Sequence, residues 1–216
     1  MAGLNRKERD LLLRKTDILK AAERIFALKG YDKARIQDIA KEAQYAAGTV
    51  YLYFKDKRAL YFSLFEGKMK DFLSLIKKEI VSANDASEKL EIFLKKELEF
   101  FKENRAFFQI FISENKASRL AIDYKISNSR VSIEYSNLTR SLIKMAQQQG
   151  IVRSDLDPNQ IAGILHSIST SIIIGWFLKS RHLEPQDPKE TARFILNIFL
   201  DGIGQKTEKG KSFFRI

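Results

Sequence analysis

Apolar residues recur at three- and four-residue steps along nearly all of this 216-residue chain, and that spacing constrains the fold more than any other feature. Only 3 prolines and 10 glycines are present to interrupt helices, and the β-branched residues do not fall in alternating runs. Hydrophobic residues form 44% of the sequence, which is enough for a sizeable core. The sequence therefore predicts an all-α protein.

Three helices are predicted near the N-terminus. The first covers about residues 8–29 and stops at Gly30, a residue typical of helix C-termini. Two short amphipathic helices follow within residues 35–54, separated by a break of a few residues. Two short helices joined by a tight turn form a helix-turn-helix arrangement.

The later helices are longer and more apolar. One is predicted to run from the N-cap Asp56 to about residue 81, and Pro158 suits the first turn of another. Residues 161–178 carry no formal charge, but this stretch is interrupted by polar side chains and is shorter than the ~20 apolar residues that a bilayer crossing needs. We expect no membrane span.

Residues 161–178 are apolar on two faces, so this helix needs two partners. The final helix is its obvious neighbour, and a second copy of the chain would cover the remaining face as a four-helix interface. The alternative is that both helices are internal core. The residues predicted to form the homodimer interface are Ile161, Leu165, Ile168, Ile172, Ile195, Ile198 and Phe199.

Charge and composition restrict the function classes. The net charge is +11, and residues 1–58 hold 14 Lys and Arg against 8 Asp and Glu. A basic N-terminal end is typical of proteins that bind nucleic acid or an acidic membrane surface, although a solvated face gives the same signal. The absence of cysteine and of a signal-like apolar start fits the cytoplasm.

Residues 18–60 carry a set of residues at fixed spacings: Ala21-Ala22, Phe26, Gly30-Tyr31, Asp38-Ile39-Ala40, Gly48-Thr49-Val50-Tyr51, Tyr53-Phe54 and Lys57. With this pattern the span resembles the N-terminal DNA-binding domain of the TetR family of transcriptional regulators. The resemblance implies an all-α homodimer, with a helix-turn-helix domain over residues 1–55 (motif about 35–54) and a ligand-binding and dimerisation domain over 56–216. It also implies a repressor that binds a pseudo-palindromic operator on double-stranded DNA and is released by a small apolar or amphipathic effector.

The resemblance places the second short helix in the major groove, where small residues at its start allow close approach and flanking hydroxyls and cations hold phosphates. Two positions depart from the family pattern. Arg35 stands where a hydroxyl usually caps the first short helix, and Gln44 replaces the glycine of the turn, which implies a strained backbone there. The predicted DNA contacts are Arg35, Gln44, Tyr45, Ala46, Ala47, Gly48, Thr49, Tyr51, Tyr53 and Lys57.

The larger domain is expected to enclose the effector, as in the family, and the aromatic side chains on its helices are the candidates for lining the pocket. The segment GTVYLYFKDK looks most like members that respond to fatty acyl-CoA, so a long-chain acyl-CoA is the first effector hypothesis. Packing in a plain core is the alternative role for these aromatics. The predicted pocket residues are Phe72, Phe107, Phe108, Phe111, Tyr124, His166 and Trp176.

Enzymatic chemistry has no candidate site in this sequence. The chain has 2 histidines and no cysteine, and it lacks a nucleophile elbow, a phosphate-binding glycine loop and a His-Glu-x-x-His metal pattern. We therefore predict no catalytic residue, metal or cofactor. The remaining alternative is an architectural or membrane-surface basic helical protein without effector control.

Overall fold

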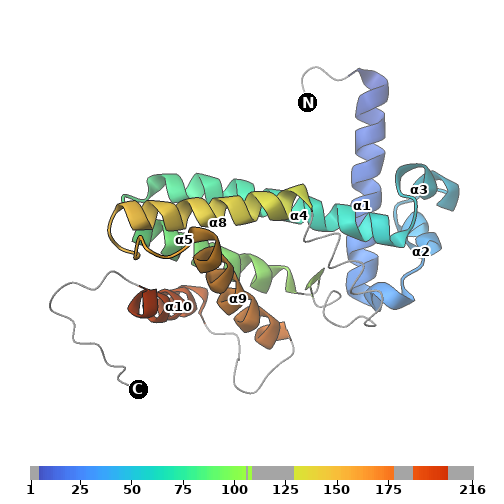
Figure 1. Cartoon of the computed structure of the whole chain (residues 1–216). Coiled ribbons are helices and arrows are strands. Elements are labelled where there is room, and N and C mark those ends of the chain that lie inside the picture. The colour runs from blue at the N-terminus through green and yellow to red at the C-terminus, as the bar shows by residue number, and fades with distance from the viewer. Residues whose placement is uncertain (1–4, 106, 109–128, 178–186, 204–216) are drawn as a thin grey trace. The chain divides into compact units, whose positions relative to one another are not determined.

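The computed structural model describes residues 5–105, 107–108, 129–177 and 187–203. Every regular element over these residues is a helix, which confirms the predicted all-α class. The elements are α1 (Arg6–Lys33), α2 (Ile36–Glu42), α3 (Ala47–Tyr53), α4 (Lys57–Glu79), the 3₁₀ turn η1 (Ile80–Ser82), α5 (Ala86–Glu103), α8 (Arg130–Gln148), α9 (Pro158–Phe177) and α10 (Pro188–Ile203) (Figure 1).

The chain forms two compact units. Unit 1 combines Met1–Asp71 with Asn104–Ser132, and unit 2 combines Phe72–Glu103 with Ile133–Ile216. Because helix α4 starts in unit 1 and ends in unit 2, the two units share a continuous helix.

In unit 1, α2 and α3 lie on one side of α1, whose N-terminal turns extend past both (Figure 1). The core that joins them contains the fully buried Ile18, Ile39 and Val50. Helix α1 is interrupted at Gly30, which adopts φ 74° and so takes a conformation that side chains other than glycine disfavour. The predicted helix stop at Gly30 is confirmed.

In unit 2, α5 packs against both α9 and α10. The apolar face of α5 buries Leu90, Leu94 and Leu98, as its sequence spacing predicts. Helix α9 begins at Pro158, also as predicted. Among the described residues α9 alone is long and apolar enough to cross a membrane, but 44% of its apolar window is buried inside the protein, and core helices pass the same test.

Candidate nucleic-acid interface

The turn between α2 and α3 is closed by two backbone hydrogen bonds. The N–H of Gln44 donates to the carbonyl of Lys41 (3.1 Å), and the N–H of Tyr45 donates to the carbonyl of Ala40 (2.8 Å). This pair is the Schellman arrangement, which requires a left-handed residue after the helix end. Gln44 takes that conformation with φ 61°, the only positive φ outside glycine in the part of the chain that the structure describes. The predicted backbone strain at Gln44 is confirmed.

Helix α3 has one buried and one exposed face. Val50 is fully buried, and Phe54, the residue that caps α3, is 3% exposed. Tyr51 and Leu52 point outward with 52% and 83% of their surface exposed. Leu52 adds an apolar side chain to this exposed face, and it was not among the predicted DNA contacts.

The remaining predicted contacts at the start of α3 are also accessible. Ala46 and Gly48 are exposed, and a side chain built on Gly48 would meet nothing within 4 Å. Ala47, Thr49 and Tyr53 are partly exposed. Helix α3 therefore presents small residues at its N-terminal end and exposed aromatic and apolar residues further along.

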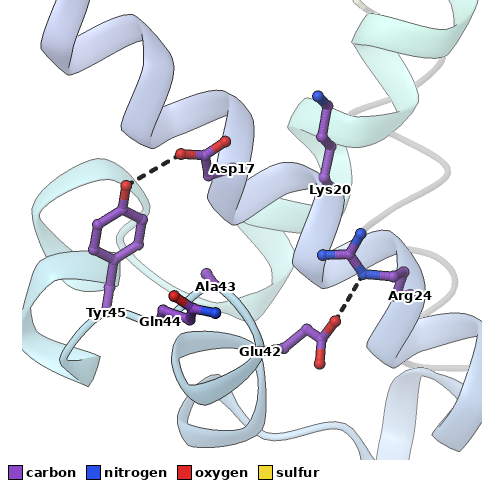
Figure 2. Close-up of a pocket in the computed structure, with 7 residues that line it drawn as sticks. All are labelled: Asp17, Lys20, Arg24, Glu42, Ala43, Gln44 and Tyr45. Atoms are coloured by element: carbon purple, nitrogen blue, oxygen red, sulfur yellow. Dashed lines mark hydrogen bonds and ion pairs between the residues drawn. The ribbon is translucent and has the colours of Figure 1, made fainter.

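Tyr45 connects the turn to α1. Its hydroxyl donates to the Asp17 carboxylate at 3.1 Å, and the two residues line a polar groove together with Lys20, Arg24 and Glu42 (Figure 2). Burial among its neighbours, followed by the hydrogen bond to Asp17, raises the pKa of Tyr45. The groove is also crossed by an ion pair of 2.8 Å between Arg24 and Glu42, which ties α1 to α2.

Lys57 has an internal role that sequence reasoning did not predict. Its ammonium donates to the carbonyls of Tyr31 (2.6 Å), Asp32 (3.2 Å) and Ala34 (3.0 Å), just past Gly30. It also lies 4.3 Å from the centre of the Tyr31 ring. Lys57 therefore fixes the junction between α1 and α2, and a contact with phosphate would compete with these carbonyls.

Arg35 precedes α2 without a side-chain cap of its own. The backbone N–H of Arg35 donates to the Asp38 carboxylate (3.2 Å), so Asp38 takes over part of the capping that a hydroxyl would perform. The same carboxylate pairs with Lys29 at 2.9 Å, and these contacts, that with Lys29 first, lower the pKa of Asp38. The guanidinium of Arg35 is left on an exposed residue at the start of the helix-turn-helix motif.

The predicted pocket residues fall in both units. In unit 2, Trp176 is buried and Phe72 stacks on Tyr135 with ring centres 6.3 Å apart. In unit 1, Phe107 stacks on Tyr61 with ring centres 5.0 Å apart, and Phe108 is buried as well. Phe111 and Tyr124 lie outside the described residues.

A polar cluster in unit 2, centred on the buried Glu97 and Tyr135, was not predicted from the sequence. Glu97 on α5 is 1% exposed and accepts a hydrogen bond of 2.5 Å from the Tyr135 hydroxyl on α8. His166 on α9 lies 3.4 Å from the same hydroxyl. Burial raises the pKa of Glu97 to about 7 and also raises the pKa of Tyr135, whereas partial loss of hydration lowers the pKa of His166. A cavity of about 170 Å³ beside Tyr135 and His166 opens between α8 and α9.

The predicted interface residues divide into two groups. Four of them are buried within unit 2 and have little surface left for a partner: Ile161, Leu165, Ile195 and Phe199. Ile168 and Ile172 are partly exposed and Ile198 is 54% exposed. Two further apolar side chains on the same helices, Ile164 and Phe194, are 52% and 62% exposed and were not predicted. An apolar surface on α9 and α10 therefore remains, but it is centred on different residues.

No cluster of metal-ligating side chains occurs among the residues that the structure describes.

Two family models match the chain in succession. Residues 18–64 match "Bacterial regulatory proteins, tetR family", and residues 65–196 match "YsiA-like protein, C-terminal region". Together they cover the helix-turn-helix motif and most of the helical remainder.

Similar proteins include regulators of fatty acid metabolism. The chain is 25% identical over 189 residues to the "Fatty acid metabolism regulator protein" of Bacillus subtilis, covering 88% of this chain and 95% of that protein. Among solved structures it resembles the fatty acid degradation regulator FadR of Bacillus halodurans, with TM-score 0.74, 26% identity and coverage of 88% and 95%. It also resembles the transcriptional regulator FadR of Bacillus subtilis in complex with stearoyl-CoA, with TM-score 0.73, 25% identity and coverage of 87% and 98%.

Proposed function

The chain belongs to the TetR family of bacterial transcriptional regulators, and from this premise we propose that it is a homodimeric repressor that binds a pseudo-palindromic operator and releases it on binding a long-chain acyl-CoA. The family membership makes it a ligand-responsive regulator and not an enzyme. The operator geometry, the dimer and the effector are the proposed parts. A regulator of this kind acts where the chromosome and acyl-CoA are found, so we expect it in the cytoplasm.

The exposed face of α3 is the observation that carries the DNA-binding part of the proposal. Gly48 at its start leaves room for the backbone to approach base edges, and the Tyr51 hydroxyl stands on an exposed ring that can reach a phosphate. Leu52 offers an apolar surface to a thymine methyl group. Because the α2–α3 turn is fixed by Gln44 and by the bond from Tyr45 to Asp17, this face is preorganised in the free protein.

The apolar surface of α9 and α10 supports the proposed dimer. Ile164, Phe194 and Ile198 each expose more than half of their surface in the single chain. Burying apolar surface yields roughly 25 cal/mol per Å², so pairing these helices with a second copy would remove a substantial unfavourable exposure. A two-fold dimer also matches the symmetry of a pseudo-palindromic operator.

The effector hypothesis rests on two observations. One is the similarity, over most of both chains, to a regulator whose structure contains stearoyl-CoA. The other is the group of aromatic side chains in unit 2, in which Phe72 and Phe93 pack against Tyr135 and Phe100 stacks on Phe72. Helix α4 carries Phe72 near one end and Lys57 at the other, so tilting α4 on ligand binding would act on the junction that Lys57 holds.

Selection from a pool of random DNA duplexes tests the proposed DNA recognition. The dimer should enrich sites with two related half-sites whose centres are about 34–36 Å apart. Tyr51→Phe removes one hydroxyl and should weaken binding to all enriched duplexes alike, whereas Gln44→Ala should change the preferred sequence.

The selection also distinguishes the alternative function. An architectural or membrane-surface protein would enrich no sequence, and its affinity would depend on salt alone. That outcome, or an enriched site without internal symmetry, would contradict the proposed operator. Small molecules released from the purified protein by denaturation, identified by mass spectrometry, test the effector class separately.

A further inference from the structure

Helix α1 begins well before the part of the chain that matches the family. The family match starts at residue 18, whereas α1 starts at Arg6. Residues 6–17, which we call the α1 extension, add about three helical turns, or about 18 Å at 1.5 Å per residue. Figure 1 shows these turns extending past α2 and α3.

The α1 extension is a defined helix because both ends of it are held. At its start, the Asn5 side chain accepts from the N–H of Glu8 (2.9 Å) and the Glu8 carboxylate accepts from the N–H of Asn5 (2.8 Å), which is a complete capping box. At its end, Asp17 accepts the hydrogen bond from Tyr45. Lys15 lies 5.9 Å from the centre of the Phe54 ring at the end of α3.

One face of the extension continues the face of α1 that packs against the helix-turn-helix motif. That packing face contains the buried Ile18 and Ile25. Stepping back from Ile18 by four and seven residues gives Arg14 and Leu11, and Lys7 lies one heptad before Arg14, so all three share this face. Lys7, Leu11 and Arg14 also line one shallow depression. Arg14 is close enough to Tyr45 for its charge to act on the Tyr45 hydroxyl.

The net charge of the extension is positive. It holds five basic and three acidic residues. Two of the three carboxylates, those of Glu8 and Asp17, are already engaged in the contacts described above. Among the residues that the structure describes, Lys7 and Arg14 form no salt bridge with their own chain. The depression that Lys7, Leu11 and Arg14 line also contains Arg6 and Asp10, so it holds three cations and one carboxylate and its net charge is positive.

We propose that the α1 extension is a second DNA-binding surface, in which Lys7 and Arg14 bind the phosphates that border the groove entered by α3. The inference rests on the proposed DNA recognition and adds contacts outside the helix-turn-helix motif. The two residues are seven positions apart, about 10 Å along the helix axis, which is roughly the rise of three base pairs. The contacts are to phosphates, so they lengthen the footprint and strengthen binding without reading sequence.

The apolar residues of the extension do not define a competing partner. Leu11, Leu12 and Leu13 are 48%, 41% and 53% exposed, but consecutive residues point 100° apart around a helix. They therefore form no stripe at three- and four-residue spacing, which a partner helix would need. The basic face, in contrast, is continuous with the α2–α3 surface.

The test compares two double variants that each remove two positive charges from exposed positions. Lys7→Gln/Arg14→Gln changes the proposed face, and Arg9→Gln/Lys78→Gln changes the opposite side of the extension and a position on α4 in unit 2. Operator affinity is measured at several salt concentrations, because each phosphate contact contributes about −0.9 to the slope of log K against log salt. Phosphate ethylation interference locates the contacted phosphates.

We expect Lys7→Gln/Arg14→Gln to flatten the slope by about 1.8 per half-site and to lose ethylation interference at phosphates beside the half-site. Each lost contact should reduce affinity roughly eightfold at 0.1 M salt, taking 1 M as the reference. The control variant should match the wild type. An unchanged salt slope and an unchanged ethylation pattern in Lys7→Gln/Arg14→Gln would overturn the inference. The inference would also be overturned if this variant kept its DNA affinity but changed its particle mass in light scattering. Both outcomes leave the operator bound through α3, so they would not contradict the proposed function itself.

Discussion

Replacing the buried Glu97 by glutamine should stabilise unit 2, and the gain should grow with pH. Glu97 is 1% exposed, accepts a hydrogen bond from Tyr135 through one oxygen, and has no hydrogen-bond partner for the other oxygen among the described residues. Burial without a cation disfavours its ionised form, and the pKa of Glu97 rises from 4.5 to about 7. Glutamine keeps the size and the hydrogen-bond acceptor for Tyr135 but does not titrate.

Proton linkage gives the direction in which the free energy of unfolding changes with pH. Between pH 4.5 and pH 7 the folded protein holds a proton on Glu97 that the unfolded chain has released, so the wild type loses stability as the pH rises through this range. Each pKa unit corresponds to about 1.4 kcal/mol, so the cost approaches about 3 kcal/mol at pH 8 and stays below about 1 kcal/mol at pH 5. Glu97→Gln removes this cost.

Urea unfolding followed by tryptophan fluorescence measures the free energy of unfolding of unit 2, which contains Glu97. Trp176 is the single tryptophan and is buried in α9 of unit 2. The difference in unfolding free energy between Glu97→Gln and the wild type should rise by about 2 to 3 kcal/mol from pH 5 to pH 8. Glu103→Gln, at an exposed position near the end of the same helix, is the control and should show no such trend. A Glu97→Gln difference that is the same at both pH values would refute the assignment of a raised pKa to this carboxyl.

Three further predictions concern the turn, its anchor and the dimer. Gln44→Gly should raise the melting temperature of the DNA-binding unit, because relieving the left-handed backbone strain stabilises the fold by about 1 kcal/mol. Gln44→Ala keeps the strain and should leave the melting temperature unchanged. Equal melting temperatures for the two variants would contradict the assignment of strain to this position. Lys57→Met should lower the same melting temperature, because it removes three hydrogen bonds to carbonyls that together stabilise the fold by about 2 kcal/mol. An unchanged melting temperature would show that these hydrogen bonds do not stabilise the unit. Ile198→Glu should halve the mass measured by light scattering, and a mass unchanged from a dimeric wild type would exclude this face of α10 from the interface.

The helix boundaries could be predicted because their signals are local. Gly30 takes the positive φ that a helix stop needs, the Asp56 carboxylate accepts the N–H of Ala59 at 2.7 Å as an N-cap should, and Pro158 opens α9. The strain at Gln44 followed equally from the missing glycine in the turn. In each case the sequence motif and the backbone geometry involve residues within a few positions of each other.

Contacts between distant residues could not be predicted in this way. Lys57 reaches the carbonyl of Tyr31, 26 positions earlier, and nothing in the sequence distinguishes it from a solvated lysine. Glu97 belongs to the charged segment KKELEF and reads as part of a polar face, yet it meets Tyr135, 38 positions later, in the core. Such pairs depend on how helices pack, and helical spacing alone does not specify which faces meet.

The apolar helices α9 and α10 illustrate the same limit. A helix that is apolar on two faces does not reveal which face is internal. Ile161 and Leu165 are predicted from the sequence to lie in the dimer interface, but both are buried within their own chain, whereas Ile164 is 52% exposed. The burial of these residues in the folded chain, and not their periodicity, identifies the surface that remains for a partner.

The central claim, that an acyl-CoA controls DNA binding, is tested most directly by measuring operator affinity with and without stearoyl-CoA. The measurement uses fluorescence anisotropy of a labelled duplex that carries the selected site, at fixed salt and saturating ligand. A coupling free energy of 1–3 kcal/mol, typical of allosteric proteins, predicts a roughly 5–150-fold loss of operator affinity, and linkage requires operator DNA to weaken stearoyl-CoA binding by the same factor. Equal operator affinities with and without bound stearoyl-CoA would contradict the account.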